Sequence, residues 1–402
     1  MGKRAEQKAD KKGFFSVYAC LFLAVLLASA GLFIGSAKKG AGIGAARACT
    51  SIWSQSILAE YDQNLQSRYD IFGYYGYPAL VEDKLAFYAE ESFGEKKNLD
   101  LQISSCSLFE HSLRNTEVFA RQIRAWGRLH PTGGQDCAPA DIKSVTHHQK
   151  PGPQVLFSDL PSEGCKTGLS LSALRKNYGL KDLVRKGSDT SFQLAYIFSH
   201  FKDQSDQQVL EESCLHSEVE YIIGGRTTDD ANENAVKGRI IALREVANLT
   251  FLENSPEKTA AIYAAAALIS PEAAQAAVQT VTAVWAYAES INDYHLLTEG
   301  YPVPKVKTDE SWATDLDAVL SEDGVDGCIY TGQKTGDTYQ DYLRLLLLTM
   351  EESTRLLRIM DLIQISMRYC YYDTFLIEDY YGGISYTCNI NGETCHVEET
   401  YE

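Results

Sequence analysis

The chain has 402 residues, of which 45% are hydrophobic and 23% charged, a composition typical of a folded protein and unlike that of a disordered one. Its formal net charge at pH 7 is -17, and this excess of carboxylates would repel polyphosphate, so nucleic acid is excluded as an expected partner. The length allows one large hydrophobic core or two smaller ones.

An uncharged, mostly apolar stretch occupies residues 13–37, close to the N-terminus. As a helix it would measure about 37 Å, more than the roughly 30 Å hydrocarbon core of a bilayer. The basic side chains in residues 1–12 favour an N-terminus inside the cell. We therefore predict a cytoplasmic tail (1–12), a single transmembrane helix (13–37) that binds the lipid bilayer, and an extracellular location for the rest of the chain.

Two other interpretations of this stretch were weighed. The sequence Ala28-Ser29-Ala30 has the small-x-small form of a signal-peptide cleavage site, although the apolar stretch exceeds the usual signal-peptide core of about 7 to 15 residues. A buried helix of a soluble protein is disfavoured, because such helices almost always have a polar face. Both retention and cleavage of the segment export residues 40–402.

The exported part is predicted to be α+β and mainly helical, with a small β-rich part at the C-terminus. An amphipathic helix continues from the membrane to about Arg68, weakened by glycines at 40, 42 and 44, where a hinge is expected. The predicted divisions are a helical stalk and first subdomain (38–130), a loop-rich region (131–215), a helical core domain (216–368) and a C-terminal segment that contains a β-hairpin (369–402).

Within these divisions, apolar periodicity and helix-capping residues predict individual elements. Ser255 is expected to cap a helix that has Pro256 in its first turn. The Gly224-Gly225 pair is expected to end the preceding element in a turn. The predicted helices are 79–93, 107–130, 232–253, 256–268, 271–297 and 338–367, with a short strand at 99–104.

A hairpin is predicted at CNINGETC, because Asn391-Gly392 is a favoured type I′ turn dipeptide. Counting outward from the turn places Cys388 opposite Cys395, and antiparallel partners lie about 4.5 to 5.5 Å apart, within reach of a disulfide. An oxidising exterior favours that bond, so we predict a possible disulfide between them. The ten cysteines include no CxxC pair, so no metal site is predicted.

Other polar clusters are interpreted as solvated. His147-His148 and His216 form no HExxH motif, and Gly224-Gly225 is not followed by a phosphate-loop sequence. The carboxylates of Glu211, Glu212, Glu218 and Glu220 are expected to form a wet helical face, because catalytic carboxylates need an enclosed apolar site. We predict no catalytic, cofactor-binding or metal-binding residues, and no enzyme activity.

The sequence resembles bacterial membrane-anchored exported proteins associated with tight-adherence (Flp-type) pilus loci, which have a pilin-like, TadE-like N-terminus. The segments that carry the resemblance are GFFSVY before the apolar helix, SILAEYDQNLQSRYDIFG (56–73), EVEYIIGG (218–225), ALREVANLTFL (242–252), VWAYAESINDYHLLTEGYPVPKVK (284–307) and DYLRLLLLTMEESTRLLRIMDLIQISMR (341–368). The resemblance implies a structural, minor-pilin-like role beside a tight-adherence pilus or a type II/IV-like secretion machine, with other pilin-like or pilus-assembly membrane proteins as partners. The alternatives are an exported cell-envelope hydrolase and a ligand-binding ectodomain.

Overall fold

The computed structural model describes residues 3–94, 100–130, 152–165, 187–205, 214–321 and 328–401. The chain divides into two compact units that each combine segments distant in the sequence. Unit 1 comprises Met1–Asp62, Gly73–Ser112 and Asp379–Tyr401, and unit 2 comprises Gln63–Phe72 and Leu113–Glu378. The six consecutive divisions drawn from the sequence stay a prediction.

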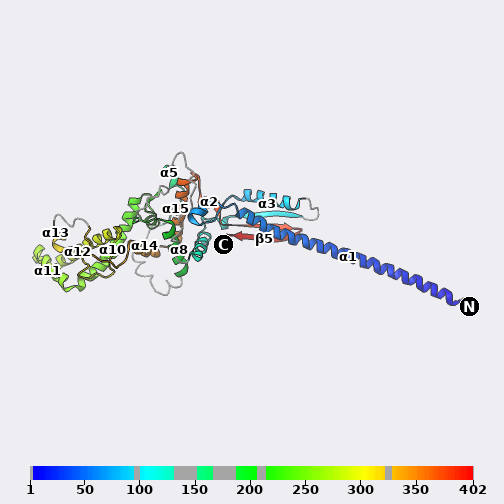
Figure 1. The fold of residues 1–402 in the computed structure, drawn as a ribbon, viewed down its shortest axis with the longest axis horizontal. Coiled ribbons are helices and arrows are strands. Elements are labelled where there is room, and N and C mark those ends of the chain that lie inside the picture. Colours follow the sequence, from blue (N-terminus) through cyan, green and yellow to red (C-terminus); the bar gives the residue numbers. More distant parts are fainter. Residues whose placement is uncertain are drawn as a thin grey trace. The chain divides into compact units, whose positions relative to one another are not determined.

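Helices dominate the fold, with short strands in unit 1 alone among the described residues (Figure 1). This confirms the predicted α+β, mainly helical class. The elements of unit 1 are α1 (Lys3–Leu58), β1 (Tyr74–Tyr75), α3 (Pro78–Phe93), β2 (Leu101–Ser107), η1 (Phe109–His111), β3 (Tyr380–Tyr381), β4 (Gly383–Ile390) and β5 (Glu393–Thr400), with η3 (Ile377–Asp379) at its boundary. Those of unit 2 are α2 (Gln63–Tyr69), α4 (Thr116–Leu129), α5 (Pro153–Leu156), α8 (Gly187–His200), α9 (Glu218–Gly224), α10 (Asp229–Asn254), α11 (Pro256–Ile269), η2 (Pro271–Ala273), α12 (Ala274–Thr298), α13 (Leu316–Leu320), α14 (Tyr339–Thr349) and α15 (Glu352–Cys370).

The first helix, α1, is continuous through the glycines at 40, 42 and 44, so the hinge expected there is wrong. A glycine in a helix interior costs about 1 kcal/mol relative to alanine. Burial of Ile43 and Ala46 in the core of unit 1 offsets that cost. The helix also ends at Leu58 rather than near Arg68, and the chain then begins the separate helix α2.

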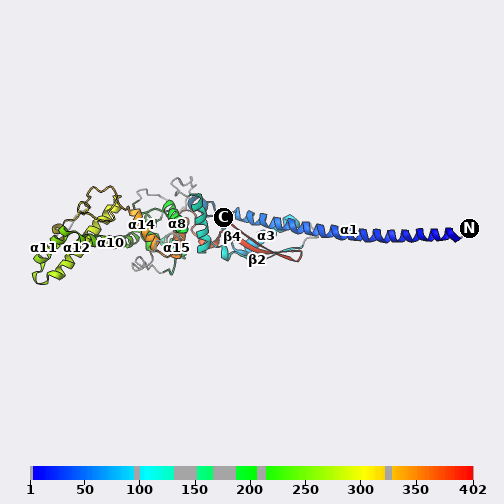
Figure 2. The same ribbon diagram turned by 90° about the horizontal axis from the view of Figure 1, so that it is seen from below.

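The sheet of unit 1 is antiparallel and has the strand order β2-β4-β5. Side chains alternate along β4, so that Ile384, Tyr386, Cys388 and Ile390 are buried on one face. α1 and α3 pack against the sheet through a shared apolar core that includes Trp53. Figure 2 shows the strands beside the end of α1, whereas the N-terminal part of α1 projects away from them.

The C-terminal hairpin has the predicted turn. Asn391 and Gly392 have φ values of 53° and 83°, as a type I′ turn requires at both central positions. The register pairs Cys388 directly with Cys395, as counted from the sequence. Between β4 and the helix, the Tyr386 hydroxyl donates to the Thr50 carbonyl oxygen at 2.9 Å, which fixes the sheet along α1.

Unit 2 contains most of the predicted helices, close to their predicted bounds. α10 and α11 occupy the helices predicted at 232–253 and 256–268, and the Ser255 hydroxyl accepts a hydrogen bond from the Lys258 amide, as a cap. The helix predicted at 271–297 is present as α12, which is preceded by one turn of 3-10 helix, η2. The helices α10, α11 and α12 pack together around Trp285 and Trp312, whose rings lie 5.4 Å apart.

Two predicted helices differ from the structure. The one expected at 338–367 is split into α14 and α15, because Met350 and Glu351 are extended and the Arg355 guanidinium binds the Leu347 carbonyl oxygen at 2.8 Å, at the end of α14. A guanidinium so placed satisfies a helix-end carbonyl that water would otherwise bind. The helix expected at 107–130 is shorter: β2 runs to Ser107, and α4 begins after its cap at Asn115.

Candidate functional site

The part of α1 from Phe15 to Ala37 is apolar, and almost all of its side chains are exposed. Among the described residues, one helix is long and apolar enough to cross a membrane, the Phe15–Leu58 part of α1. None of its most apolar window is buried by the protein, and Phe22 and Leu32 are 69% and 77% exposed. Large apolar side chains left in water over several turns are costly, so this surface requires an apolar partner. Its length and composition fit a membrane anchor or a signal sequence.

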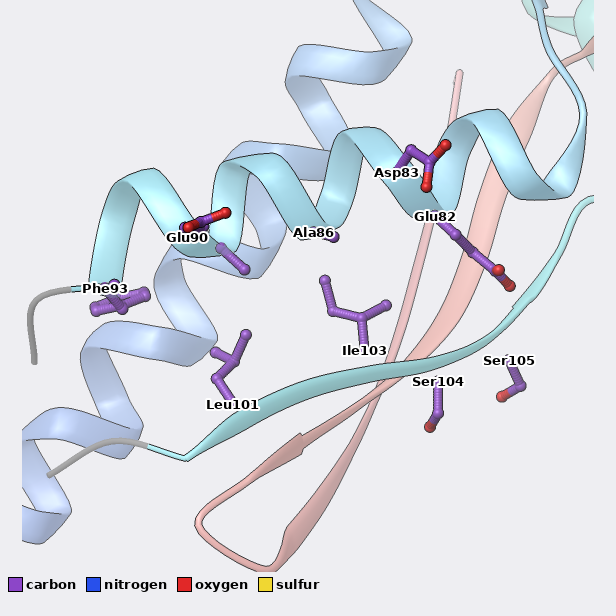
Figure 3. Close-up of a pocket in the computed structure, with 11 residues that line it drawn as sticks. Glu82, Asp83, Ala86, Glu90, Phe93, Leu101, Ile103, Ser104 and Ser105 are labelled. Carbon is purple, nitrogen blue, oxygen red and sulfur yellow. The ribbon is translucent and has the colours of Figure 1, made fainter. Parts of the chain in front are cut away.

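A groove lies between α3 and the edge strand β2 in unit 1 (Figure 3). It has a volume of about 620 Å³. Leu101 and Ile103 form an apolar floor on β2, and acidic side chains of α3 line it as well: Glu82, Asp83 and Glu90. The described residues that line it include no histidine, cysteine or basic side chain. The groove is therefore suited to binding a cationic, partly apolar group.

The two cysteines predicted to pair lie on the same hairpin of unit 1. Both are free thiols in the structure, Cys388 buried and Cys395 partly buried. Burial raises the pKa of the Cys388 thiol to about 11. Directly opposed residues of an antiparallel pair meet the Cα spacing of a disulfide, so the register permits the bond. The disulfide itself stays a prediction.

We expect protein isolated without reductant to contain the Cys388–Cys395 disulfide. A crosslink over so short a loop should stabilise the hairpin by about 2–3 kcal/mol. Mass spectrometry of alkylated, unreduced peptides measures the bond, and urea unfolding with and without reductant measures its effect. Cys106→Ser, on the neighbouring strand, is the control that should leave the bond intact. Full alkylation of Cys388 without reduction would contradict the expectation.

The acidic residues of α9, Glu218 and Glu220, are buried. The prediction that they belong to a solvent-exposed helical face is therefore wrong. The Glu218 carboxylate accepts a hydrogen bond from the Lys202 amide at 3.1 Å. Glu220 Oε1 accepts from the Gln204 amide at 3.0 Å and from the Tyr339 hydroxyl at 2.8 Å. These carboxylates therefore hold the backbone after α8 against α9. Burial raises the pKa of Glu220 to about 7.

The raised pKa of Glu220 predicts a pH-dependent stability. The folded-state pKa of Glu220 lies above its unfolded value, so protonated Glu220 contributes to the free energy of unfolding. This contribution is complete below about pH 4.5 and is lost as the pH rises through about 7, a change of about 3 kcal/mol. Glu220→Gln keeps an acceptor oxygen but cannot ionise. We expect the stability of the wild type relative to Glu220→Gln to fall by that amount between pH 4.5 and 8, measured by urea unfolding. Glu253→Gln, at an exposed position of α10, controls for the loss of one charge, and a pH-independent difference for Glu220→Gln would contradict the assignment.

A network of four charged side chains is buried between α10, α12 and the loop after α12. It contains two cations and two carboxylates, Arg244, Lys307, Glu289 and Asp293, whose side chains are at most 2% exposed. Arg244 Nε donates to Asp293 at 2.9 Å, and its Nη1 donates to the Pro304 carbonyl oxygen at 3.0 Å. Because the two cations and two carboxylates balance and contact one another, the network avoids the large cost of an isolated buried charge. This network fixes the loop that contains Lys307 onto both helices.

Of the other residues singled out in the sequence, those that the structure describes join no site. His147, His148, Glu211 and Glu212 lie outside the described residues. His216 is exposed, and the Gly224-Gly225 pair forms the predicted turn, with Gly225 in the left-handed conformation at φ 65°. No group of three or more His, Cys, Asp or Glu side chains in the described ranges is arranged to hold a metal ion.

The buried charge network was not predicted from the sequence. A signal was present, because Glu289 and Asp293 are four residues apart and therefore share one face of an alanine-rich, apolar helix. Carboxylates on the buried face of such a helix require cationic partners. The partners themselves, Arg244 and Lys307, come from other elements, and only the fold reveals them.

Comparison with known proteins adds one finding. A family model matches residues 149–392, more than half of the chain, from before α5 to the turn of the C-terminal hairpin. No curated protein and no solved structure matches the chain. The matched range contains α9 and the whole charge network of unit 2. The chain therefore belongs to DUF5702, a family of unknown function.

Proposed function

We propose that the protein is a single-pass, membrane-anchored extracytoplasmic structural protein, minor-pilin-like and associated with a tight-adherence pilus or a type II/IV-like secretion machine. The observation that carries the proposal is the change of environment along α1. Its part from Phe15 to Ala37 exposes apolar side chains on all sides, and its last turns pack on the sheet of unit 1. In this proposal the first part lies in the bilayer, with the N-terminus in the cytoplasm, and the second part connects it to a folded ectodomain.

The exposed part of α1 also has a face of small residues that supports helix association. Ala24, Ala28, Gly31 and Gly35 follow each other at intervals of four, three and four residues, which places them on one side of the helix. A Cβ atom built at Gly31 or Gly35 meets no atom within 4 Å. Small residues allow close contact between helices in a membrane. We propose that this face binds the apolar helices of other pilin-like or pilus-assembly membrane proteins.

The proposed role is not catalytic. The buried carboxylates of α9 bind backbone amides, and the described residues that line the groove of unit 1 include no histidine, cysteine or basic side chain. A second candidate, a ligand-binding ectodomain, is favoured by that groove alone, since its acidic side chains and apolar floor suit a cationic ligand. Titration with cationic peptides, followed by fluorescence of Trp53, which contacts the groove residue Phe93, tests this candidate.

The test of the proposal combines topology and association. Protease added to intact protoplasts should digest the C-terminal units, and detergent but not salt should release the full chain from membranes.

Native co-purification should recover other membrane proteins with apolar N-terminal helices. Gly31→Leu/Gly35→Leu should reduce that recovery and keep the chain in the membrane. Ser29→Leu/Ser36→Leu, on a different side of α1, is the matched control. Protection of the C-terminal units in protoplasts, or recovery of a lone diffusing species, would count against the proposal.

A further inference from the structure

One contact in the buried charge network of unit 2 is not an ordinary ion pair. Lys307 Nζ lies 2.7 Å from Asp293 Oδ1, and the two side chains are 1% and 0% exposed. Despite this distance, Asp293 Oδ1 accepts no hydrogen bond of regular geometry from any described residue. The Lys307 amine therefore lies against the Asp293 carboxyl group without a regular hydrogen bond to the oxygen that it contacts, which leaves the amine available for addition to the carboxyl carbon.

The second oxygen of the same carboxyl group is held by two donors. Arg244 Nε and Asn248 Nδ2 donate to Asp293 Oδ2 at 2.9 and 3.1 Å. When an amine adds to a carboxyl carbon, negative charge develops on one oxygen, and fixed donors at that oxygen stabilise it. The two Asp293 oxygens are thus distinct: Oδ2 is positioned to carry the developing charge, and Oδ1 is free to leave.

A proton acceptor is also in place beside the amine. Glu289 Oε1 lies 2.5 Å from Lys307 Nζ, within reach of its protons. The amide and the hydroxyl of Thr314 both donate to Glu289 Oε2 at 2.8 Å, which fixes the carboxylate. Positioned acids and bases accelerate such transfers because no diffusion step is needed. Glu289 Oε1 and Asp293 Oδ1 both contact Nζ, so Glu289 can take a proton from the amine and pass it to the departing oxygen.

We propose that Lys307 and Asp293 condense into an intramolecular isopeptide bond, with Glu289 as the proton relay. The bond from Nζ to Cγ of Asp293 forms and the bond from Cγ to Oδ1 breaks. Two protons of the ammonium group pass by way of Glu289 to Oδ1, which leaves as water, so one cation and one carboxylate become a neutral amide and no oxidant or other reactant is required. The product removes two desolvated charges and leaves Arg244 and Glu289 as one cation and one carboxylate, so the buried network stays neutral overall. The inference does not depend on the proposed function.

The test is a peptide map of the full chain, purified in detergent and denatured. Because a modified Lys307 resists trypsin, the wild type should give one branched species that joins the peptide ending at Lys305 to the peptide 306–334, lighter by one water than the two linear peptides together. Lys307→Arg keeps the charge but should give only linear peptides. Lys258→Arg, a lysine beside Trp285 in the adjacent apolar cluster, is the matched control and should keep the branch.

Glu289→Gln tests the relay, since it keeps both reacting side chains. It should give linear peptides or greatly slowed conversion. If this variant fails to fold, the peptide map of the wild type still tests whether the Lys307–Asp293 bond forms. Linear peptides from the wild-type chain, with cleavage after Lys307, overturn the proposal. A fully branched map from Glu289→Gln overturns the assignment of Glu289 as relay.

Discussion

Replacing Arg244 by methionine is expected to lower the free energy of unfolding of unit 2 by about 3–5 kcal/mol, the usual cost of removing one partner from a buried charge pair. The methionine side chain fills much of the volume but donates no hydrogen bond. The loss leaves the Pro304 carbonyl oxygen and one Asp293 oxygen with fewer donors in a site without solvent. Urea unfolding followed by circular dichroism measures the change.

The matched control is Lys305→Met, in the same loop. Lys305 is 77% exposed and pairs with Asp337 at 3.3 Å, so its loss should cost at most about 1 kcal/mol. The comparison separates burial from charge, because both variants remove one cation that contacts one carboxylate. Equal effects of the two substitutions would show that the network contributes no more than a surface ion pair.

Gly225→Ala should lower the free energy of unfolding by about 2–4 kcal/mol. Gly225 ends α9 in the left-handed conformation, which costs a residue with a Cβ atom about 1–2 kcal/mol. The added Cβ would also lie 2.7 Å from the Arg358 guanidinium carbon. That guanidinium cannot move freely, because its Nη1 donates to the carbonyl oxygens of Ile222 and Ile223 at the end of α9. The same urea unfolding measurement reports the loss.

Gly238→Ala provides the opposite expectation for the same chemical change. Gly238 lies inside α10, and a Cβ atom there meets nothing within 4 Å. Alanine should therefore stabilise the helix by about 0.5–1 kcal/mol. If both glycine substitutions changed stability in the same direction, the conformational argument for Gly225 would fail.

Local patterns in the sequence were sufficient for most helices and for the hairpin. Apolar periodicity and the Ser255 cap identified α10 and α11 within a few residues, because caps and side-chain spacing are properties of neighbouring residues. The Asn391-Gly392 dipeptide gave the turn type and the register of Cys388 and Cys395 for the same reason. The apolar part of α1 was recognised from its length alone.

Features that depend on distant residues were missed. The break between α14 and α15 lies inside a continuous helical pattern, and Arg355, which binds the Leu347 carbonyl oxygen there, is held by Gln193 of α8 at 2.6 Å. α1 persists through its glycines because it packs on strands some 340 residues later in the chain. Glu218 and Glu220 resemble surface residues by type, and only the backbone amides that they bind explain their burial. Tertiary contacts routinely override local propensity in this way.

The pairing of α1 with the last strands has a consequence for synthesis. The ribosome releases α1 before most of unit 2, and β4 and β5 after it, so unit 1 lacks two of its three long strands until residues 383–400 have been made. Contacts between such distant residues close slowly, because a long loop must be ordered before they form. During translation, unit 2 can fold first, while the apolar side chains of α1 that later pack on the sheet remain exposed to solvent. A chain that stops before residue 380 would keep that side open permanently and become a target for chaperones and proteases.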